Sequence, residues 1–175
     1  ARNPVDIPLA EKKEILDEYN SVIWSTPKLQ TSVIGYSDNY RKYLYINSMG
    51  SYIEQERADV TLRITAIAAD NGEVQQAGLS LGNRGDFNRI KNLHQQVKEM
   101  AQRAVDMLTA PHVKGGEYIV VLDPVLAGVF IHEAFGHLSE ADHVYENPQL
   151  REIMTIGKKF GCDELNVVDG AVVAG

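Results

Sequence analysis

The 175-residue sequence has a single cysteine, Cys162, and a shortage of basic residues. One cysteine excludes an intrachain disulfide, and a reducing cytoplasm is then the expected compartment. The 17 Lys and Arg residues against 24 Asp and Glu residues give a formal net charge of −7, so an electrostatic nucleic-acid surface is not expected. No stretch reaches the ~18 uninterrupted apolar residues of a membrane span, and no charged start followed by an apolar core marks a secretory signal.

Two common catalytic patterns are also missing. No glycine-rich phosphate loop precedes a helix, and no serine nucleophile motif is present. The length suffices for one domain with a sizeable core and a smaller appendage. We divide the chain into an N-terminal helix and linker (1–28), a sheet with a long helix (29–110) and a segment that carries the candidate site (111–175).

The first two segments predict an antiparallel sheet. Pro8 to Tyr19 has the pattern of a short amphipathic helix. Asn71-Gly72 is typical of a two-residue hairpin turn, because both positions tolerate positive φ angles. Alternation predicts a meander of about four strands, with a further turn at Ser48-Met49-Gly50. The expected strands are Leu29 to Tyr36, Tyr40 to Asn47, Tyr52 to Ala69 and Glu73 to Leu81.

A long helix is expected to cover this sheet. From Asp86, an N-cap or first-turn acid, apolar residues recur at alternating three and four spacing, which indicates one helix of about 24 residues. His94 lies within the stripe and is expected to be packed. Ala110-Pro111 ends the helix, because proline disfavours helical angles in the residue before it. The stripe comprises Phe87, Ile90, His94, Val97, Ala101, Ala104 and Leu108.

The third segment is expected to contain both strands and helices, so the predicted fold class of the chain is α+β. Tyr118 to Leu122 has the composition of a strand and leads into an apolar stretch, which predicts a packed helix start with the following histidines emerging into a cleft. Pro148 suits the first turn of another helix, Gln149 to Lys159. Leu165 to Val168 resembles a short strand.

The candidate site is the run His132-Glu133-Ala134-Phe135-Gly136-His137. Zinc is held by neutral imidazole nitrogens, and a hydrolase also needs a carboxylate beside the metal to take a proton from water. His132 and His137 are therefore the candidate ligands, and Glu133 is the candidate base.

The spacing of the two histidines leaves two alternatives. Five residues turn an ideal α-helix through about 500°, which leaves the rings about 140° apart. Either the pair is not a site, or the helix contains one π-type turn, which returns positions five apart to one face. Gly136, which tolerates unusual backbone angles, sits where that distortion is needed.

Other side chains near the motif are candidates for a third ligand. Glu140, Asp142 and His143 follow at once, and surface exposure is the alternative for each. Cys162 is the remaining candidate, although a lone cysteine is more often a small core residue.

These residues resemble the modulator-of-DNA-gyrase family of metallopeptidases, the TldD and PmbA proteins. The resemblance is specific from His132 to Asp142 and through Glu146-Asn147-Pro148, and looser upstream, at Tyr36-Ser37-Asp38, Glu54 to Arg57 and Gly82 to Asp86. It favours the TldD branch, because the PmbA-like subunit generally lacks the paired histidines.

The resemblance implies a zinc-dependent peptidase that cleaves small or unfolded peptides, as a homodimer or a heterodimer with a PmbA-like subunit. It implies a metal site completed by a cysteine from a C-terminal domain. Since the sequence stops at Gly175, we expect a fragment that lacks this domain, binds zinc weakly or not at all, and is inactive alone. The alternative is a non-catalytic interaction or assembly domain with a vestigial or structural metal helix.

Overall fold

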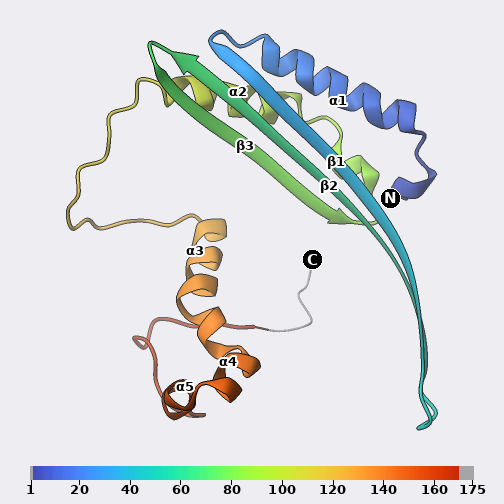
Figure 1. Cartoon of the computed structure of the whole chain (residues 1–175), viewed down its shortest axis with the longest axis vertical. Helices are drawn as coiled ribbons and strands as arrows, with labels where there is room; N and C mark the ends of the chain where they lie inside the picture. Colours follow the sequence, from blue (N-terminus) through green and yellow to red (C-terminus); the bar gives the residue numbers. More distant parts are fainter. Residues whose placement is uncertain (1, 170–175) are drawn as a thin grey trace. The chain divides into compact units, whose positions relative to one another are not determined.

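The computed structural model describes residues 2–169, and the chain divides into two compact units, residues 1–113 and residues 114–175. The fold class is α+β, as predicted, with an antiparallel sheet and flanking helices in the first unit (Figure 1). Residues 1–28, expected as a separate segment, are part of this unit. Residues 170–175 of the expected third segment lie outside the described part.

The sheet is a meander of three strands in the order β1-β2-β3. Its strands are β1 (Leu29–Ile46), β2 (Tyr52–Asp70) and β3 (Glu73–Arg84). The expectation of about four strands is wrong, because the two expected segments 29–36 and 40–47 are one continuous strand. Ser37, Asp38 and Asn39 pair with Thr61, Val60 and Asp59 without a break in register.

The predicted hairpin turn between β2 and β3 is confirmed. Asn71 and Gly72 have φ angles of 49° and 87°, and Asp70 pairs with Glu73 on either side of them. Both residues therefore supply the positive φ angles that a two-residue connection demands.

Helix α1 (Leu9–Trp24) is longer than the predicted helix from Pro8 to Tyr19. Ile15, Tyr19 and Ile23 are its buried residues, and their spacing of four places them on one face. The helix stops before Pro27, because proline disfavours helical angles in the preceding residue. A short 3-10 helix, Pro4–Asp6, precedes α1.

The predicted 24-residue helix is wrong in length. It is split into a 3-10 helix, Phe87–Ile90, and α2 (His94–Asp106). Asn92 separates them with a φ of 60°, a left-handed angle that no α-helix accommodates. Asp86 is a cap, as predicted, but of the 3-10 helix, where its side chain accepts from the Asn88 N–H. His94 is only partly packed: its ring lies edge-on to that of Tyr19, with centroids 5.2 Å apart, but its side chain is 49% exposed and its Nε2 lies 3.1 Å from a carboxylate oxygen of Glu18.

The core of the first unit lies on one face of the sheet. Val60, Leu62 and Ile64 of β2 are at most 1% exposed, and they alternate with more exposed neighbours, as on a sheet covered on one side. Both helices contribute to the same cluster, with Tyr19 from α1 and Val97 from α2 fully buried.

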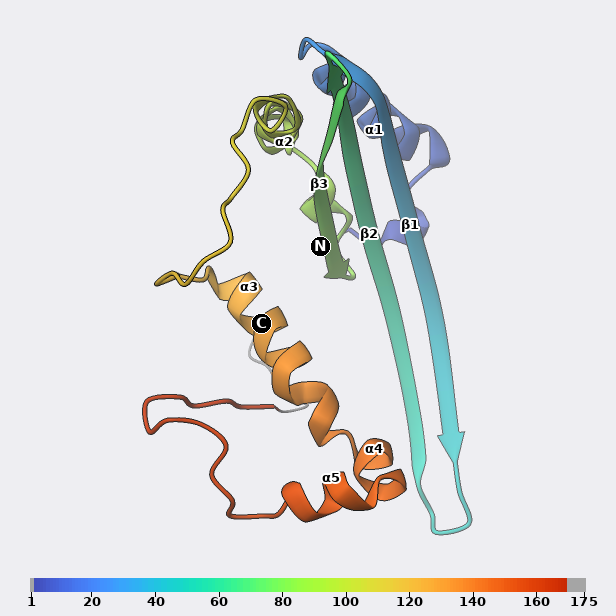
Figure 2. The same cartoon turned by 60° about the vertical axis from the view of Figure 1, so that its left-hand side comes forward.

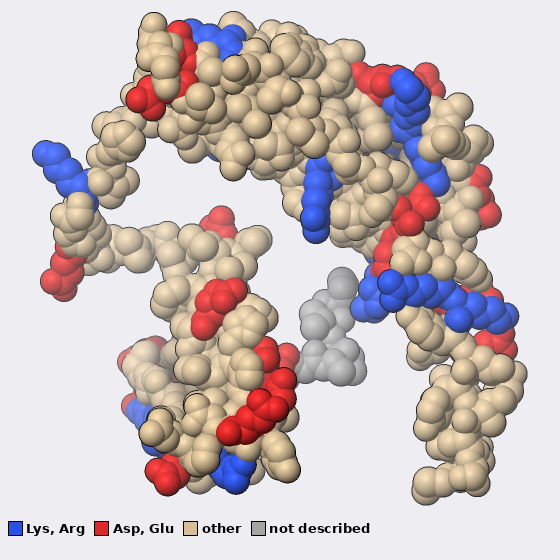
Figure 3. Space-filling model, in the orientation of Figure 1, with Lys and Arg blue, Asp and Glu red and all other residues tan. Residues whose placement is uncertain are grey.

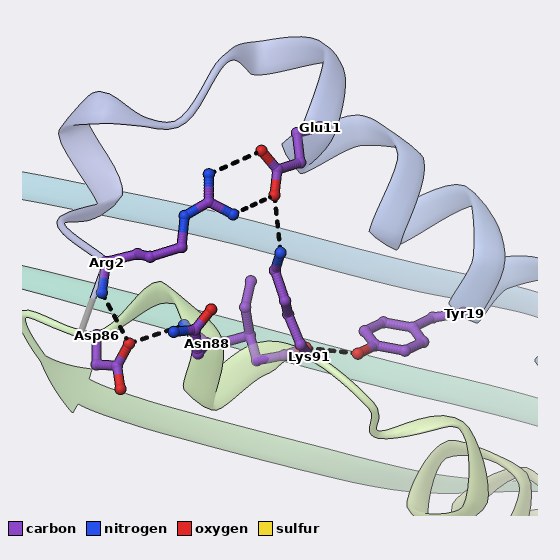
Figure 4. Close-up of polar contacts among 7 residues, drawn as sticks. Arg2, Glu11, Tyr19, Asp86, Asn88 and Lys91 are labelled. Atoms are coloured by element: carbon purple, nitrogen blue, oxygen red, sulfur yellow. Dashed lines mark hydrogen bonds and ion pairs between the residues drawn. The ribbon is translucent and has the colours of Figure 1, made fainter.

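A polar network ties the N-terminal segment to the loop before α2 (Figure 4). The Arg2 guanidinium donates to Glu11 at 2.7 Å, and Lys91 donates to the same carboxylate at 2.8 Å. These two donors lower the pKa of Glu11 to about 2. The Arg2 backbone N–H donates to Asp86 at 3.1 Å.

Strands β1 and β2 extend beyond β3 as a two-stranded hairpin (Figure 2), because the pairing of β3 with β2 ends at Asp59↔Arg84. We call residues 40–58 the hairpin arm. Its end, residues 43–53, carries no charged side chain (Figure 3). Several large apolar side chains there are 47–91% exposed, namely Tyr43, Leu44, Tyr45, Ile46, Met49, Tyr52 and Ile53.

The second unit is helical. It contains α3 (Pro124–Ile131), a π-helical turn (His132–Gly136), a 3-10 turn (His137–Ser139), α4 (Ala141–Glu146) and α5 (Pro148–Ile153). None of its described residues is buried. The expectation of a packed helix start is therefore wrong: Val125 is 77% and Phe130 57% exposed.

Three further predictions for this unit are wrong. Residues 118–122 and 165–168 form no strand, because no described segment pairs with either of them. The predicted helix from Gln149 to Lys159 ends at Ile153, and Gly157 has a φ of 87°, which is outside the helical range. Pro148 does occupy the first turn, as predicted. No described helix has both the length and the apolar character that crossing a membrane requires.

Candidate metal centre

Local sequence signals start the helix that carries the motif. The Asp123 side chain accepts from the Leu126 N–H at 2.8 Å, which satisfies one free donor of the first turn. Pro124 occupies the next position, where its missing N–H costs nothing. The helix then runs without interruption into His132.

The helix widens at the motif. Residues His132–Gly136 form a π-helical turn, and the His137 backbone N–H donates to the His132 carbonyl, five residues earlier. The locally widened helix, which was one of the two alternatives left by the spacing, is thus confirmed. Such single π turns occur frequently at functional sites.

The widened turn brings the motif side chains together. The ring centroids of His132 and His137 are 4.5 Å apart, and His137 Nε2 lies 3.6 Å from a carboxylate oxygen of Glu133. One ligand atom from each of the three residues lies within 4.8 Å of the other two. Donor atoms around a tetrahedral zinc ion are about 3.3 Å apart, as bond lengths near 2.05 Å require, so the three ligand atoms lie near one another but not at the spacing of a bound ion.

Gly136 does not have the role expected from the sequence. Its φ and ψ angles, −55° and −53°, are ordinary right-handed helical values, so the π turn demands no glycine-specific backbone. A Cβ atom at this position would lie 3.5 Å from His132 Nδ1, which is an ordinary van der Waals contact.

The ring of His137 has a different partner on each side. Its Nδ1 lies 2.6 Å from Glu140 Oε1, while Nε2 is the atom near Glu133. His143 Nδ1 lies 2.9 Å from the His137 carbonyl oxygen, and this hydrogen bond raises the pKa of His143 above its ordinary value. The sequence interpretation considered Glu140 only as a ligand. The three-residue spacing, which places side chains side by side on a helical turn, was the available signal for its contact with His137.

None of the candidate third ligands joins the group of ligand atoms formed by His132, Glu133 and His137. Glu140, Asp142 and His143 form a separate group whose ligand atoms lie within 4.8 Å of one another. Cys162 is exposed and belongs to neither group.

A hollow of about 560 Å³ lies beside His132. Ile131, Phe135 and Val167 give it apolar walls, and Glu140 adds a carboxylate. No sequence pattern predicted that residues near 167 would reach the motif helix. The site as a whole is open to solvent, since the side chains of His137 and Glu133 are 46% and 64% exposed.

Comparison with known families gives two matches that together span nearly the whole chain. The PmbA/TldA metallopeptidase central domain matches residues 2–108, and the PmbA/TldA metallopeptidase C-terminal domain matches residues 115–174. The boundary between the matches coincides with the division between the two compact units.

Similar curated proteins are named metalloproteases. The chain is 44% identical to the metalloprotease slr0863 of Synechocystis over 99% of its length, and 36% identical to the metalloprotease MJ0996 of Methanocaldococcus jannaschii, also over 99%. It is 28% identical, over 90% of its length, to a protein of Saccharolobus solfataricus named zinc metalloprotease TldD homolog, of which it covers 36%. The chain spans 38% of the length of each of the first two relatives.

Proposed function

The chain belongs to the PmbA/TldD family of metallopeptidases, and we propose that it carries the metal-binding motif of a zinc-dependent peptidase. The observation that carries this proposal is the π turn, which brings His132 and His137 to a ring separation of 4.5 Å despite their five-residue spacing. The position of the two rings thus adds geometric support to the resemblance seen in the sequence.

Zinc is the proposed metal because of the donor set. Two imidazoles with a carboxylate close by suit zinc better than magnesium or calcium, which prefer oxygen ligands alone. The name of the Saccharolobus relative, a zinc metalloprotease, supports the same choice. His132 and His137 would hold the ion, which supplies Lewis-acid polarisation of the scissile carbonyl and lowers the pKa of water.

Glu133 is the proposed general base. It takes a proton from the attacking water and returns one to the nitrogen of the leaving amine. Its carboxylate lies 3.6 Å from His137 Nε2 and is well exposed, so it has access both to water and to a substrate on the open side of the motif.

The substrates we propose are small or unfolded peptides. Within the described part of the second unit the motif side chains are exposed, which suits an extended substrate, and the hollow beside His132 has the size of a pocket for peptide side chains. A catalytic zinc ion normally has three protein ligands. The chain spans 38% of the length of the Synechocystis relative, and we propose that the third ligand belongs to another part of the whole protein. This chain alone is then expected to bind zinc weakly.

We also propose that the whole protein, acting in the cytoplasm, works as a homodimer or with a PmbA-like subunit. The exposed apolar end of the hairpin arm supports this, because contiguous exposed apolar patches commonly mark protein interfaces. Light scattering on the whole protein, alone and mixed with a PmbA-like subunit, measures its oligomeric state directly. A monomer in both samples at micromolar concentration would reject the dimer.

The test of the peptidase proposal is Glu133→Gln in the whole protein. We expect this substitution to abolish peptide hydrolysis while the zinc content stays unchanged, because glutamine cannot take the proton. Glu152→Gln is the matched control, since Glu152 is an exposed residue of α5 and its loss should leave the rate unaltered. An unchanged rate in the Glu133 variant would reject the proposed base.

The exposed arm also favours a second candidate function, a non-catalytic assembly domain. In that case, replacing both His132 and His137 by alanine leaves partner binding and cellular function intact. The peptidase proposal predicts instead that the double variant keeps its partner but loses zinc and hydrolysis together.

A further inference from the structure

The imidazole of His137 lies between two carboxylates, each of which is near a different ring nitrogen. Glu140 Oε1 is 2.6 Å from Nδ1, and Glu133 Oε2 is 3.6 Å from Nε2. The first distance is that of a hydrogen bond between charged and neutral groups, whereas the second is too long for one. The ring is therefore held from its Nδ1 side and left available on its Nε2 side.

We propose that Glu140 is a positioning residue that fixes the tautomer and the orientation of His137 for zinc; the inference rests on the proposed peptidase function. An ionised carboxylate only accepts hydrogen bonds, so His137 Nδ1 must carry the proton and donate it to Glu140. The lone pair of the ring then lies on Nε2, the nitrogen that faces Glu133. Histidine ligands commonly donate their second ring N–H to a carboxylate in this way, which makes them stronger ligands.

The local backbone places Glu140 for this contact. The 3-10 turn His137–Ser139 ends at Glu140, whose extended angles (φ −65°, ψ 134°) begin α4. The spacing of three residues brings its side chain back over His137. The ring of His143 contacts the same residue through its backbone, because its Nδ1 lies 2.9 Å from the His137 carbonyl oxygen, and it also lies 3.8 Å from Glu140 Oε2.

The same contacts assign Glu140 a role other than that of a ligand. Its Oε1 is engaged by His137, and its Oε2 faces the ring of His143. A separate cation held by Glu140, Asp142 and His143 is the competing interpretation, because their ligand atoms lie within 4.8 Å of one another. That interpretation makes Asp142 essential, whereas the positioning role makes it irrelevant.

The tautomer of His137 can be read without any metal. In the metal-free whole protein at mildly alkaline pH, nitrogen-15 NMR should show a proton on Nδ1 of His137. Glu140→Ala should shift the ring to the Nε2–H form that neutral histidine favours in water, and Glu140→Gln, whose side-chain oxygen still accepts, should retain the Nδ1–H form. A wild-type ring protonated on Nε2 would overturn the proposal.

Zinc affinity of the whole protein, measured with zinc alone against a competing chelator, supplies the second readout. We expect Glu140→Ala to weaken binding about 10- to 100-fold, the usual effect of removing such a partner, and Glu140→Gln to weaken it less. Glu152→Gln is the matched control and should bind as the wild type does. Circular dichroism confirms that each variant remains helical.

The outcomes separate this inference from the function on which it rests. If alanine at His132 or His137 leaves zinc affinity unchanged, the proposed metal site itself is wrong. If those variants lose zinc while Glu140→Ala binds normally, only the positioning role is wrong. If Asp142→Asn weakens binding as much as Glu140→Ala does and His132→Ala has no effect, the cation lies in the Glu140 group, which also overturns the inference.

Discussion

The backbone N–H of His137 donates to the carbonyl oxygen of His132, and this one hydrogen bond determines which side chains of the motif meet. In a regular α-helix the acceptor would be the carbonyl one residue later, and the two rings would diverge by about 140°. The wider loop adds a residue to the turn without requiring any unusual φ angle at Gly136.

Changing the number of residues between the histidines should therefore change zinc affinity, and a deletion should have a different effect from an insertion. Deleting Ala134 leaves a four-residue spacing, which a regular helix places about 40° apart, so measurable binding should remain. Inserting one alanine after Ala134 gives a six-residue spacing, which leaves the rings about 120° apart on a regular helix. A π turn aligns positions five apart rather than six, so the insertion should abolish binding. Zinc titration of the whole protein against a chelator measures both effects.

Ala134→Ser is the control for these spacing variants, because it alters the same position and preserves the number of residues between His132 and His137. It should bind zinc as the wild type does. Equal affinities in the deletion and insertion variants would mean that the two rings do not share an ion.

The site illustrates what a sequence can predict about local geometry. The five-residue spacing of His132 and His137 made a π turn the only helical geometry compatible with a shared ion, and that turn is present. The hydrogen bond between His137 and Glu140 was not predicted, because a carboxylate three residues away is equally able to bind a metal, a proton donor or water. Only the folded position of the side chain distinguishes these roles.

The fold shows the same division between local and tertiary signals. The turn at Asn71 and Gly72 was predictable because the two residue types themselves favour positive φ angles. The break at Asn92 was not, since the apolar stripe from Phe87 to Leu108 continues across it at helical spacing. Ile90 and Leu93 are buried on either side of the break, so tertiary packing rather than the pattern determines where α2 begins.

Tyr19 should contribute strongly to the stability of the first unit. It is fully buried, donates to the Ile90 carbonyl at 2.5 Å and accepts from the Leu93 N–H at 3.2 Å. Tyr19→Phe leaves both backbone groups unsatisfied, which costs about 1–3 kcal/mol of unfolding free energy. Urea denaturation measures the loss. Tyr45→Phe on the exposed arm is the control and should change stability by less than about 0.5 kcal/mol.

The Glu11 network predicts a stability that falls in acid. Hydrogen bonds from Arg2 and Lys91 lower the pKa of Glu11 from 4.5 to about 2 in the folded state. A lowered pKa means that the unfolded chain binds a proton more readily, so this stabilisation is complete above pH 4.5 and is lost as the pH falls towards 2. Urea denaturation across this range should show the decline.

Glu11→Gln isolates the contribution of this one carboxylate. The variant should be less stable than the wild type at neutral pH, and the difference should shrink as the pH falls below 4.5. High salt should reduce the difference as well, because the network is exposed and screened by ions. A difference between the two proteins that is independent of pH would contradict the assigned pKa.

The hairpin arm should be dispensable for the folding of the first unit. No residue between Arg41 and Arg57 belongs to the buried core, and Lys42 pairs with Glu54 and Glu56 only at the surface, where ion pairs contribute at most about 1 kcal/mol. Tyr40 and Ala58 are direct partners across β1 and β2, so a two-residue Asn-Gly turn can join them after residues 41–57 are removed.

We expect this truncation to change the unfolding free energy of the first unit by less than about 1 kcal/mol, since it removes exposed surface and exposed ion pairs only. Fluorescence of Trp24, the single tryptophan, follows unfolding in urea. A loss of several kcal/mol would mean that the arm supports the core. In the whole protein, the same truncation should abolish dimer formation while this unit stays folded, because the apolar residues 43–53 would no longer be available to a partner. A dimer that survives the truncation would instead require another interface.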